Sequence, residues 1–559
     1  MDPSLARAPN IILILLDTLR ADHLSVYGYK RRTSPQLERL AKEGVLFENA
    51  FAHSNWTPPS TTTLLTSLYE SVHGVNRIKS YLPDGVTTLA EALRGAGYTS
   101  AFWSANGLVS IRANYTQGFD YASQVSDAYQ AIRWRNRFPV YQLYSWRSVD
   151  QLSQWFYPNW ENNPQGTTPF PPPMAALETL NVSLEHLFNE VSVDKTDMAG
   201  AERGGWVRTI KPFNAYYRAA KADWMNEHVR AYLSYMTSQS GYDPRRNKFF
   251  LYLHYFDPHA PYRPPPQYRR VFDPDFRGRS VEGRKDGTTK VCQDVEDAVA
   301  TGECYVDNYW STKTEGPLGE QELHNMVAQY DGEILFLDRF LAELLRFLKK
   351  KGLFENTLLV ITSDHGEGFY EHKTYGHGIT MYQEEVHIPL IVTWPRGLSR
   401  GVRLSDPVGL VDIMPTVLEA VGVPAVPCMQ GRSLLGVMRG TEHRRELYGE
   451  TAYYRGARLF FVRDQMKLIH EGLIDLRSAL RPQPRSKYLF NLKDDPGERK
   501  NLLGSKGARK LPPQLVKSLQ GSMDRWYKSV REACRFYKPR EADIPKDIEE
   551  RLKALGYRD

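Results

Sequence analysis

The chain has 559 residues, of which 41% are hydrophobic and 25% charged. This composition excludes a disordered or collagen-like chain, and the length predicts one large α/β domain with a smaller appendage. The formal charge of +7 favours anionic ligands. Since no nucleic-acid-binding motif accompanies that charge, we expect no nucleic acid partner, and the oligomeric state stays open.

The sequence carries no recognisable membrane or export signal. The apolar run Ile11 to Leu16 is much shorter than the roughly 20 residues that span a bilayer, and residues 1–10 lack the apolar core of a secretory signal. We therefore expect no transmembrane segment and a cytoplasmic chain, or a periplasmic or extracellular one after processing. Cys292 and Cys304 could pair or stay free thiols.

Apolar runs and helical patterns alternate along the first hundred residues, as in the βαβ units of a doubly wound parallel layer. In chain order the pattern predicts a strand at 10–16, a helix at 34–43, a strand at 45–51, helices at 57–69 and 88–97, and a strand at 100–104.

The later sequence predicts an insertion and a second domain. Residues 121–212 are rich in Trp and Pro and interrupt the alternation. The expected elements after them are a helix at 219–236, a strand at 249–253, a helix at 321–349, strands at 357–361 and 388–393, a helix at 411–421, strands at 447–451, 459–463 and 466–470, and a basic helical tail. We predict an α/β domain over 1–405, which contains the insertion, and a smaller α+β domain over 406–559.

Polar residues follow directly on three expected strands. Asp17 ends the first strand, Thr57 opens the helix after the second, and Asp364 and His365 follow a strand that ends at Ser363. Ligands of open parallel sheets gather at the carboxyl ends of the strands. Two carboxylates, an imidazole and a hydroxyl there suit one divalent cation, Mn, Zn, Ca or Mg, although each residue alone also fits a cap or a turn.

Thr57 is the candidate nucleophile. A helix that starts at Thr57-Pro58-Pro59 presents the positive end of its dipole and backbone N–H groups, which would stabilise an alkoxide. Coordination to a dication would lower the pKa of the hydroxyl further. The alternative is an ordinary threonine at a helix N-cap.

Several histidines complete the candidate site. His254, Asp257 and His259 follow an apolar strand, and His377 lies shortly after the Asp364 turn. Such residues could contact non-bridging oxygens, protonate a leaving group or bind a second metal. We predict catalytic roles for His259 and His377 and substrate contacts for His254 and, after the strand at 100–104, Asn106; a second metal stays open.

Six segments in order resemble the sulfatase-like members of the alkaline phosphatase superfamily. They are NIILILLDTLRADHLSVYGY (10–29), WTPPSTTTLLTSLYESVH (56–73), HYFDPHAPY (254–262), TSDHGEG (362–368), YGHGITMYQEEVHIP (375–389) and KYLFNLKDDPGERKNLL (487–503). The resemblance implies a mixed, mostly parallel sheet between helices, with a smaller C-terminal α+β domain. It implies a metal held by Asp17, Thr57, Asp364 and His365, with His259 at the substrate oxyanion.

The chain departs from the sulfatase pattern at three places. Sulfatases have Cys or Ser in Cys/Ser-x-Pro-x-Arg, which is oxidised to formylglycine, whereas this chain has Thr57 there and Thr61 in place of the Arg. Threonine cannot give that aldehyde, so we expect no formylglycine. Thr18 replaces the second of two aspartates, and the lysine after the Asp-His turn is missing near His377.

The resemblance and the departures together predict a metal-dependent hydrolase of phosphate or sulfate esters that forms a covalent intermediate on Thr57. A phosphodiester or phosphonate monoester is favoured, within an anionic small molecule, glycan or lipid. The alternatives are a sulfatase acting on sulfated sugars or aryl sulfates, a phosphoethanolamine- or phosphoglycerol-type transferase, and a non-catalytic anion-binding protein.

Overall fold

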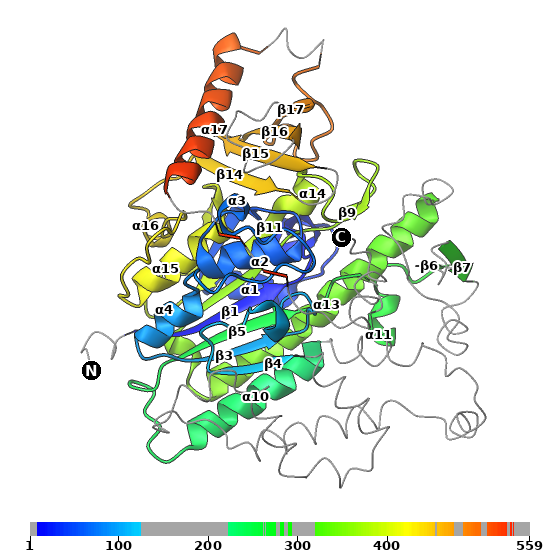
Figure 1. The fold of residues 1–559 in the computed structure, drawn as a ribbon. Helices are drawn as coiled ribbons and strands as arrows, with labels where there is room; N and C mark the ends of the chain where they lie inside the picture. Colours follow the sequence, from blue (N-terminus) through cyan, green and yellow to red (C-terminus); the bar gives the residue numbers. More distant parts are fainter. Residues whose placement is uncertain are drawn as a thin grey trace, which may run out of the picture.

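A large mixed sheet forms the centre of the molecule (Figure 1). The computed structural model describes residues 8–124, 222–260, 262, 264–275, 280–283, 289–292, 319–452, 456–473, 484–504, 511–533, 537–538 and 540–541. Within them the strand order is β12 (Val402–Leu404), β2 (Val45–Phe51), β11 (His387–Thr393), β8 (Thr357–Ser363), β1 (Asn10–Leu16), β5 (Phe249–Tyr255), β3 (Thr99–Ser104) and β4 (Tyr121–Gln124), with β13 (Val408–Gly409) also paired to β2.

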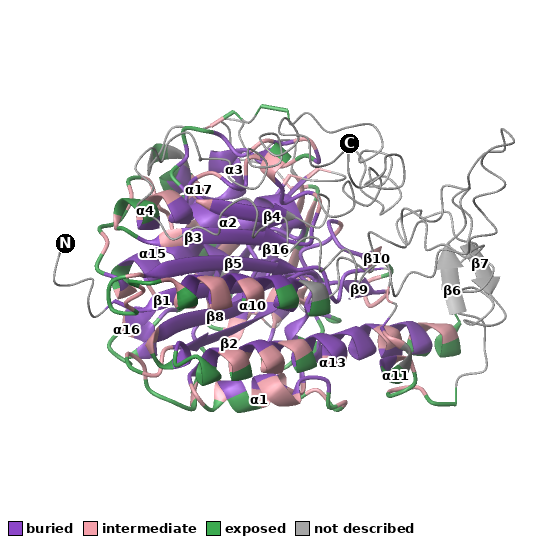
Figure 2. Ribbon diagram, turned by 90° about the horizontal axis from the view of Figure 1, so that it is seen from below, coloured by how far each residue is buried: buried purple, intermediate pink, exposed green. Residues whose placement is uncertain are grey.

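Most neighbouring strands in this sheet are parallel. The run β8, β1, β5, β3, β4 is parallel throughout, and β11 alone among the paired strands runs antiparallel to both of its neighbours, β2 and β8. Strand β1 lies in the middle and is buried on both faces, as its unbroken apolar sequence predicts (Figure 2). The predicted fold class, a mixed and mostly parallel sheet between helices, is confirmed.

Helices cover both faces of the sheet. One face packs against α1 (Pro35–Ala41), α10 (Ala222–Ser238) and α13 (Glu320–Lys350), and the other against α2 (Thr57–Thr66), α4 (Leu89–Gly95), α15 (Ile413–Ala420) and α16 (Leu435–Met438). Along β1, Ile12, Ile14 and Leu16 belong to the α13 side, and Ile11, Leu13 and Leu15 to the α2 side. The alternation of side chains along a strand therefore directs residue 17 towards α2.

Two elements differ from the predictions in ways that affect the site. The helix that begins at Thr57 ends at Thr66, because Ser67 adopts a left-handed conformation with φ 57°. A separate short helix, α3 (Glu70–His73), follows it. Strand β5 continues to Tyr255, two residues beyond the predicted end, so that His254 lies within the strand instead of after it.

The C-terminal part forms a smaller antiparallel sheet. Its strands are β14 (Glu446–Thr451), β15 (Ala457–Arg463), β16 (Met466–Leu473) and the unpredicted β17 (Ser486–Asn491). Helix α17 (Pro513–Ala533) packs on this sheet, away from the central strands (Figure 1). The smaller C-terminal domain is thus confirmed, while its predicted start at residue 406 stays a prediction; β13 and α15, which follow that point, pack in the central layer.

Several short helices and strands lie between these larger elements. They are α11 (Pro266–Arg269), α14 (Gln383–Val386), the pair β9 (Gly368–Phe369) and β10 (Tyr375–Gly376), and the pair β6 (Ser280–Gly283) and β7 (Thr289–Cys292). Most of the predicted insertion, residues 125–212, and the pairing of Cys292 with Cys304 lie outside the described residues. No described helix combines the length and apolar character needed to cross a bilayer.

Candidate active site

Three central strands end together at one edge of the sheet. Leu16, the last residue of β1, is opposite Tyr255 of β5 and Ser363 of β8. Asp17 and Asp364 directly follow these ends, so the parallel register brings both carboxylates to the same place. This is the edge at which the sequence predicts a metal site.

Two carboxylates, an imidazole and a hydroxyl converge there. One ligand atom each from Asp17, Asp364 and His365 lies within 4.8 Å of the others. His365 Nε2 is 3.9 Å from Asp17 Oδ1, 3.5 Å from Asp364 Oδ2 and 3.1 Å from Thr57 Oγ1. All four side chains are fully buried. The structure therefore brings together the four residues predicted to hold a metal.

Asp17, Asp364 and His365 each have one side-chain atom held by a hydrogen bond and another that faces the cluster. Asp364 Oδ1 accepts hydrogen bonds from the backbone N–H of Thr18 (3.2 Å) and of His365 (3.0 Å). His365 Nδ1 donates to the next residue's carbonyl at 2.8 Å, which leaves Nε2 as the acceptor. Asp17 Oδ2 accepts from Asn106. Within the described part of the chain, Asp17 Oδ1 and Asp364 Oδ2 accept no hydrogen bond.

The electrostatics of the cluster fit a bound cation. Burial and the charge of Asp17 raise the pKa of Asp364. Burial would also raise the pKa of Asp17, but His259, His254 and His365 outweigh it, so that pKa lies below its usual range. Among the described residues no Lys or Arg forms an ion pair with either carboxylate. Buried carboxylate oxygens without donors are expensive unless a cation neutralises them, so these residues fit a dication.

Thr57 begins α2, as predicted, but the helix end contributes less than the sequence suggests. Pro58 and Pro59 carry no N–H, and the Ser60 N–H points to the Trp56 carbonyl at 3.4 Å. The first turn therefore offers few backbone donors to an anion. This corrects the expectation that backbone N–H groups there would stabilise an alkoxide.

Two further imidazoles lie beside the cluster. The ring of His377 is 4.1 Å from that of His365 and 5.2 Å from that of His259, measured between centroids. His377 Nδ1 is 2.9 Å from Glu367 Oε1, and the Tyr262 hydroxyl donates to Glu367 Oε2 at 2.8 Å. Burial raises the pKa of Glu367 to about 7. The sequence analysis missed Glu367, although an acidic residue two positions after the His365 turn could have indicated it.

His254 and Asn106 both contact Asp17. Asn106 Nδ2 donates to Asp17 Oδ2 at 2.6 Å, and His254 Nε2 lies 3.3 Å from the same oxygen. Substrate contact by either residue stays a prediction. Asp257 is directed elsewhere, because its carboxylate accepts from the backbone N–H of Ala222 at the start of α10 (2.9 Å).

Two other supporting residues were missed by the sequence analysis. Ser363 Oγ accepts from the Leu19 N–H at 2.9 Å and donates to the His365 carbonyl at 2.7 Å, so it fixes both loops that carry ligands. The buried Glu385 accepts from Asn55 Nδ2 at 3.1 Å, two residues before Thr57. Glu385 also accepts from the N–H groups of Ile379 and Thr380 nearby in the chain, whereas its contact with Asn55 spans 330 positions and could not be read from the sequence.

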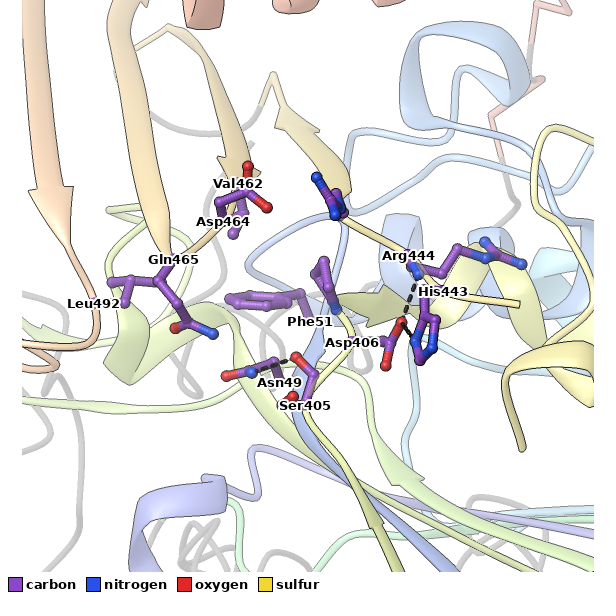
Figure 3. Close-up of a pocket in the computed structure, with 12 residues that line it drawn as sticks. Asn49, Phe51, Ser405, Asp406, His443, Arg444, Val462, Asp464, Gln465 and Leu492 are labelled. Carbon is purple, nitrogen blue, oxygen red and sulfur yellow. Dashed lines mark hydrogen bonds and ion pairs between the residues drawn. The ribbon is translucent and has the colours of Figure 1, made fainter. Parts of the chain in front are cut away.

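A separate hollow lies between the central and C-terminal sheets (Figure 3). It has a volume of about 340 Å³ and an apolar floor that includes Phe51, Val462 and Leu492. Asn49 Nδ2 donates to the Ser405 carbonyl at 2.7 Å along its wall. None of the predicted site residues lines it.

Two known proteins with similar structures act on different esters. A protein solved with its substrate D-glucosamine-2-N,6-O-disulfate has a TM-score of 0.61 and 18% identity, covering 95% of this chain and 100% of that one. The phosphonate monoester hydrolase of Silicibacter pomeroyi has a TM-score of 0.58 and 18% identity, covering 94% of this chain and 96% of that one. At this identity the likeness shows the fold.

Sequence comparison identifies the family. The arylsulfatase of Clostridium perfringens is 23% identical over 529 residues, which are 92% of this chain and 95% of that protein. A model described as the N-sulphoglucosamine sulphohydrolase C-terminal region matches residues 370–525. The sulfatase family model matches residues 9–423, more than half of the chain. The chain therefore belongs to the sulfatase family, whose members are ester hydrolases with the alkaline phosphatase-like fold.

Proposed function

We propose that this chain is a metal-dependent hydrolase that cleaves a phosphodiester or phosphonate monoester through a covalent ester on Thr57. The observation that carries the proposal is the position of Thr57 Oγ1, 3.1 Å from His365 Nε2, within the buried cluster of Asp17, Asp364 and His365. A hydroxyl that lies next to an imidazole and a candidate metal site is well placed to act as an activated nucleophile.

One divalent metal would be held by Asp17 Oδ1, Asp364 Oδ2, His365 Nε2 and Thr57 Oγ1. A bound dication supplies a lower pKa for the threonine hydroxyl and neutralises charge on the substrate. The imidazole nitrogen beside three oxygen donors suits Zn better than Ca or Mg, which prefer oxygen ligands.

The side chains then have separate roles in the proposed reaction. The ionised Thr57 oxygen attacks phosphorus, an Oγ1–P bond forms, and the bond to the leaving oxygen breaks. His259 and His377 lie beside each other, with ring centroids 5.2 Å apart. Burial lowers the pKa of His377 well below its usual range, so His259 would give a proton to the leaving oxygen. Water then attacks the threonine ester at phosphorus and frees Thr57 for the next cycle.

The choice of phosphorus over sulfur rests on the identity of the nucleophile. Formylglycine releases sulfate by elimination from a hemiacetal, which a threonine ester cannot do, so its ester must be cleaved at the central atom. The fold likeness to a phosphonate monoester hydrolase supports this choice. The second candidate, hydrolysis of a sulfated sugar, is supported by the likeness to the protein bound to a disulfated glucosamine.

The decisive experiment is a substrate panel with two nucleophile variants. Metal-stripped protein is reloaded with Mn, Zn, Mg or Ca and tested on aryl phosphate, phosphodiester, phosphonate and sulfate esters. We expect a phosphodiester or phosphonate to be preferred, Thr57→Ser to retain activity and Thr57→Ala to lose it. Mass spectrometry of the peptide that contains Thr57 should show a trapped adduct. Full activity in Thr57→Ala would exclude the mechanism, and a preference for sulfate esters would favour the second candidate.

The structure also bears on the compartment. Cys428 is disulfide-bonded, and disulfides persist mainly in oxidising compartments. We infer that the processed, periplasmic or extracellular alternative fits this chain better than the cytoplasm. An anionic glycan, lipid or small-molecule ester would be met there as the substrate.

A further inference from the structure

The two oxygens of the Asp17 carboxylate have different surroundings. Oδ2 accepts from Asn106 Nδ2 at 2.6 Å and lies 3.3 Å from His254 Nε2. Oδ1 accepts no hydrogen bond from the described residues and lies 3.9 Å from His365 Nε2. Asn106 therefore holds Oδ2, with the His254 ring beside it, and Oδ1 faces the other proposed metal ligands.

Both side chains at Oδ2 are themselves fixed. Asn106 Oδ1 accepts from the Leu108 N–H at 2.8 Å, which orients the amide with its NH₂ group towards Asp17. His254 Nδ1 lies 3.3 Å from the Tyr252 hydroxyl, and this contact orients the imidazole ring. His254 Nε2 faces Asp17 Oδ2 at 3.3 Å, and it makes no hydrogen bond within the described residues.

These contacts come from two neighbouring strands. His254 is in β5, opposite Leu15 of β1 and Ser104 of β3 in the register of the sheet. Asn106 follows β3 by two residues. The sheet thus holds Asp17, Asn106 and His254 at fixed spacing near the ends of adjacent strands. Side chains positioned by a sheet are placed more precisely than side chains on loops.

We propose that Asn106 and His254 are positioning residues that restrict Asp17 to one-oxygen coordination, and that they thereby give the site its preference for a small transition metal over calcium. This inference rests on the proposed metal site. Ca²⁺ takes six to eight oxygen ligands and often binds carboxylates through both oxygens, whereas Zn²⁺ accepts four ligands including nitrogen.

The second carboxylate is restricted in the same way. Asp364 Oδ1 accepts from two backbone N–H groups, those of Thr18 and His365, so Oδ2 alone remains for a metal. Thr18 stands where the resemblance expects another aspartate, so the site also has one carboxylate fewer. Asp17, Asp364, His365 and Thr57 then supply four donor atoms, the number that zinc takes and fewer than the six to eight oxygens of calcium.

The test measures metal affinity directly, without substrate. Metal-stripped wild type, Asn106→Ala and His254→Ala are titrated with Mn²⁺ by calorimetry, and Ca²⁺ is measured by competition. Loss of a group that orients a metal ligand typically weakens metal binding about 10- to 100-fold. We expect the Mn²⁺ affinity to fall by that factor and the Ca²⁺ affinity to fall less or to rise. The ratio of Mn²⁺ affinity to Ca²⁺ affinity should therefore be smaller than in wild type.

Two further variants separate orientation from general destabilisation. His254→Gln keeps an amide N–H donor and should recover most of the Mn²⁺ affinity that His254→Ala loses. His53→Ala removes an equally buried histidine whose Nδ1 contacts the Tyr448 carbonyl, and it should leave the metal affinities unchanged. Thermal unfolding confirms that each variant is folded.

Several results would overturn the inference. Mn²⁺ and Ca²⁺ affinities within about threefold of wild type in both alanine variants would show that Asp17 does not need this support. Two ions per wild-type chain, one of them lost in His254→Ala, would make His254 a ligand of a second metal. The readout is independent of turnover: activity retained in Thr57→Ala would remove the proposed nucleophile and leave the affinity ratios unaffected.

Discussion

Glu70 places a buried carboxyl group between α2 and the C-terminal sheet. It accepts from Ser54 Oγ at 3.0 Å and from the Ala452 N–H at 2.7 Å, and Ser54 in turn accepts from Ser60 Oγ of α2 at 3.1 Å. Burial, together with the nearby Glu450, raises the pKa of Glu70 from 4.5 to about 8. Glu70 is therefore protonated in the folded chain at neutral pH.

The raised pKa makes stability depend on pH with a definite sign. Between pH 4.5 and 8 the folded chain binds more protons at Glu70 than the unfolded chain, so rising pH lowers the free energy of unfolding across that window. Each pH unit inside the window changes this free energy by about 1.4 kcal/mol. From pH 6 to pH 8, Glu70 alone should lower the free energy of unfolding by about 2 kcal/mol.

Glu70→Gln removes this titration while keeping the shape of the side chain. Urea unfolding of wild type and variant at pH 6 and pH 8 gives the difference between them at each pH, in which the titration of other groups cancels. Relative to wild type, the variant should gain about 2 kcal/mol from pH 6 to pH 8. The exposed Glu355→Gln is the control and should gain nothing. An equal difference between Glu70→Gln and wild type at both pH values would refute the reasoning.

Three further predictions concern the site and the buried charges. Glu367→Leu removes the acceptor of His377 Nδ1 and should lower kcat/KM by about tenfold or more while the bound Mn²⁺ stays at one per chain; steady-state kinetics and metal analysis check this, and a loss of metal instead would contradict it. Lys467→Met leaves the fully buried Glu498 without its partner at 3.0 Å and should destabilise the chain by about 3–5 kcal/mol. The double variant with Glu498→Gln should recover much of this loss, and urea unfolding of both variants measures it. Removal of metal by a chelator should lower Tm, since the two carboxylates of the cluster lose their counter-ion. Mn²⁺ at about 100 times its Kd should restore about 2.7 kcal/mol of the free energy of unfolding, and an unchanged Tm would count against the metal site.

The parts of the fold that follow from local pattern could be predicted from the sequence. Strand β1 begins and ends at Asn10 and Leu16, because an unbroken apolar run is what a central parallel strand requires. The cluster of Asp17, Asp364 and His365 could be predicted for a related reason. Residues that directly follow parallel strands must meet at one edge, whatever the connections between those strands.

Features that depend on distant partners could not be predicted in this way. Asn106 reaches Asp17 across 89 positions of the chain, and nothing near Asn106 specifies that partner. The break at Ser67 depends on a similar contact, since its hydroxyl donates to the Val411 carbonyl at 2.7 Å. The end of β5 was misplaced because His254 is polar, although its neighbours on both sides continue the pairing.

The remaining question of sulfur or phosphorus depends on Thr57 more than on the surrounding fold. Proteins of similar structure include one solved with a sulfated sugar and one that hydrolyses phosphonate monoesters, so the shared fold accommodates both central atoms. In this chain Thr57 lies beside the cluster of Asp17, Asp364 and His365, and the proposed mechanism makes its hydroxyl the nucleophile. A threonine ester must be released by attack of water at its central atom. We therefore expect this second step, more than the first attack, to decide between a phosphorus and a sulfur ester as the substrate.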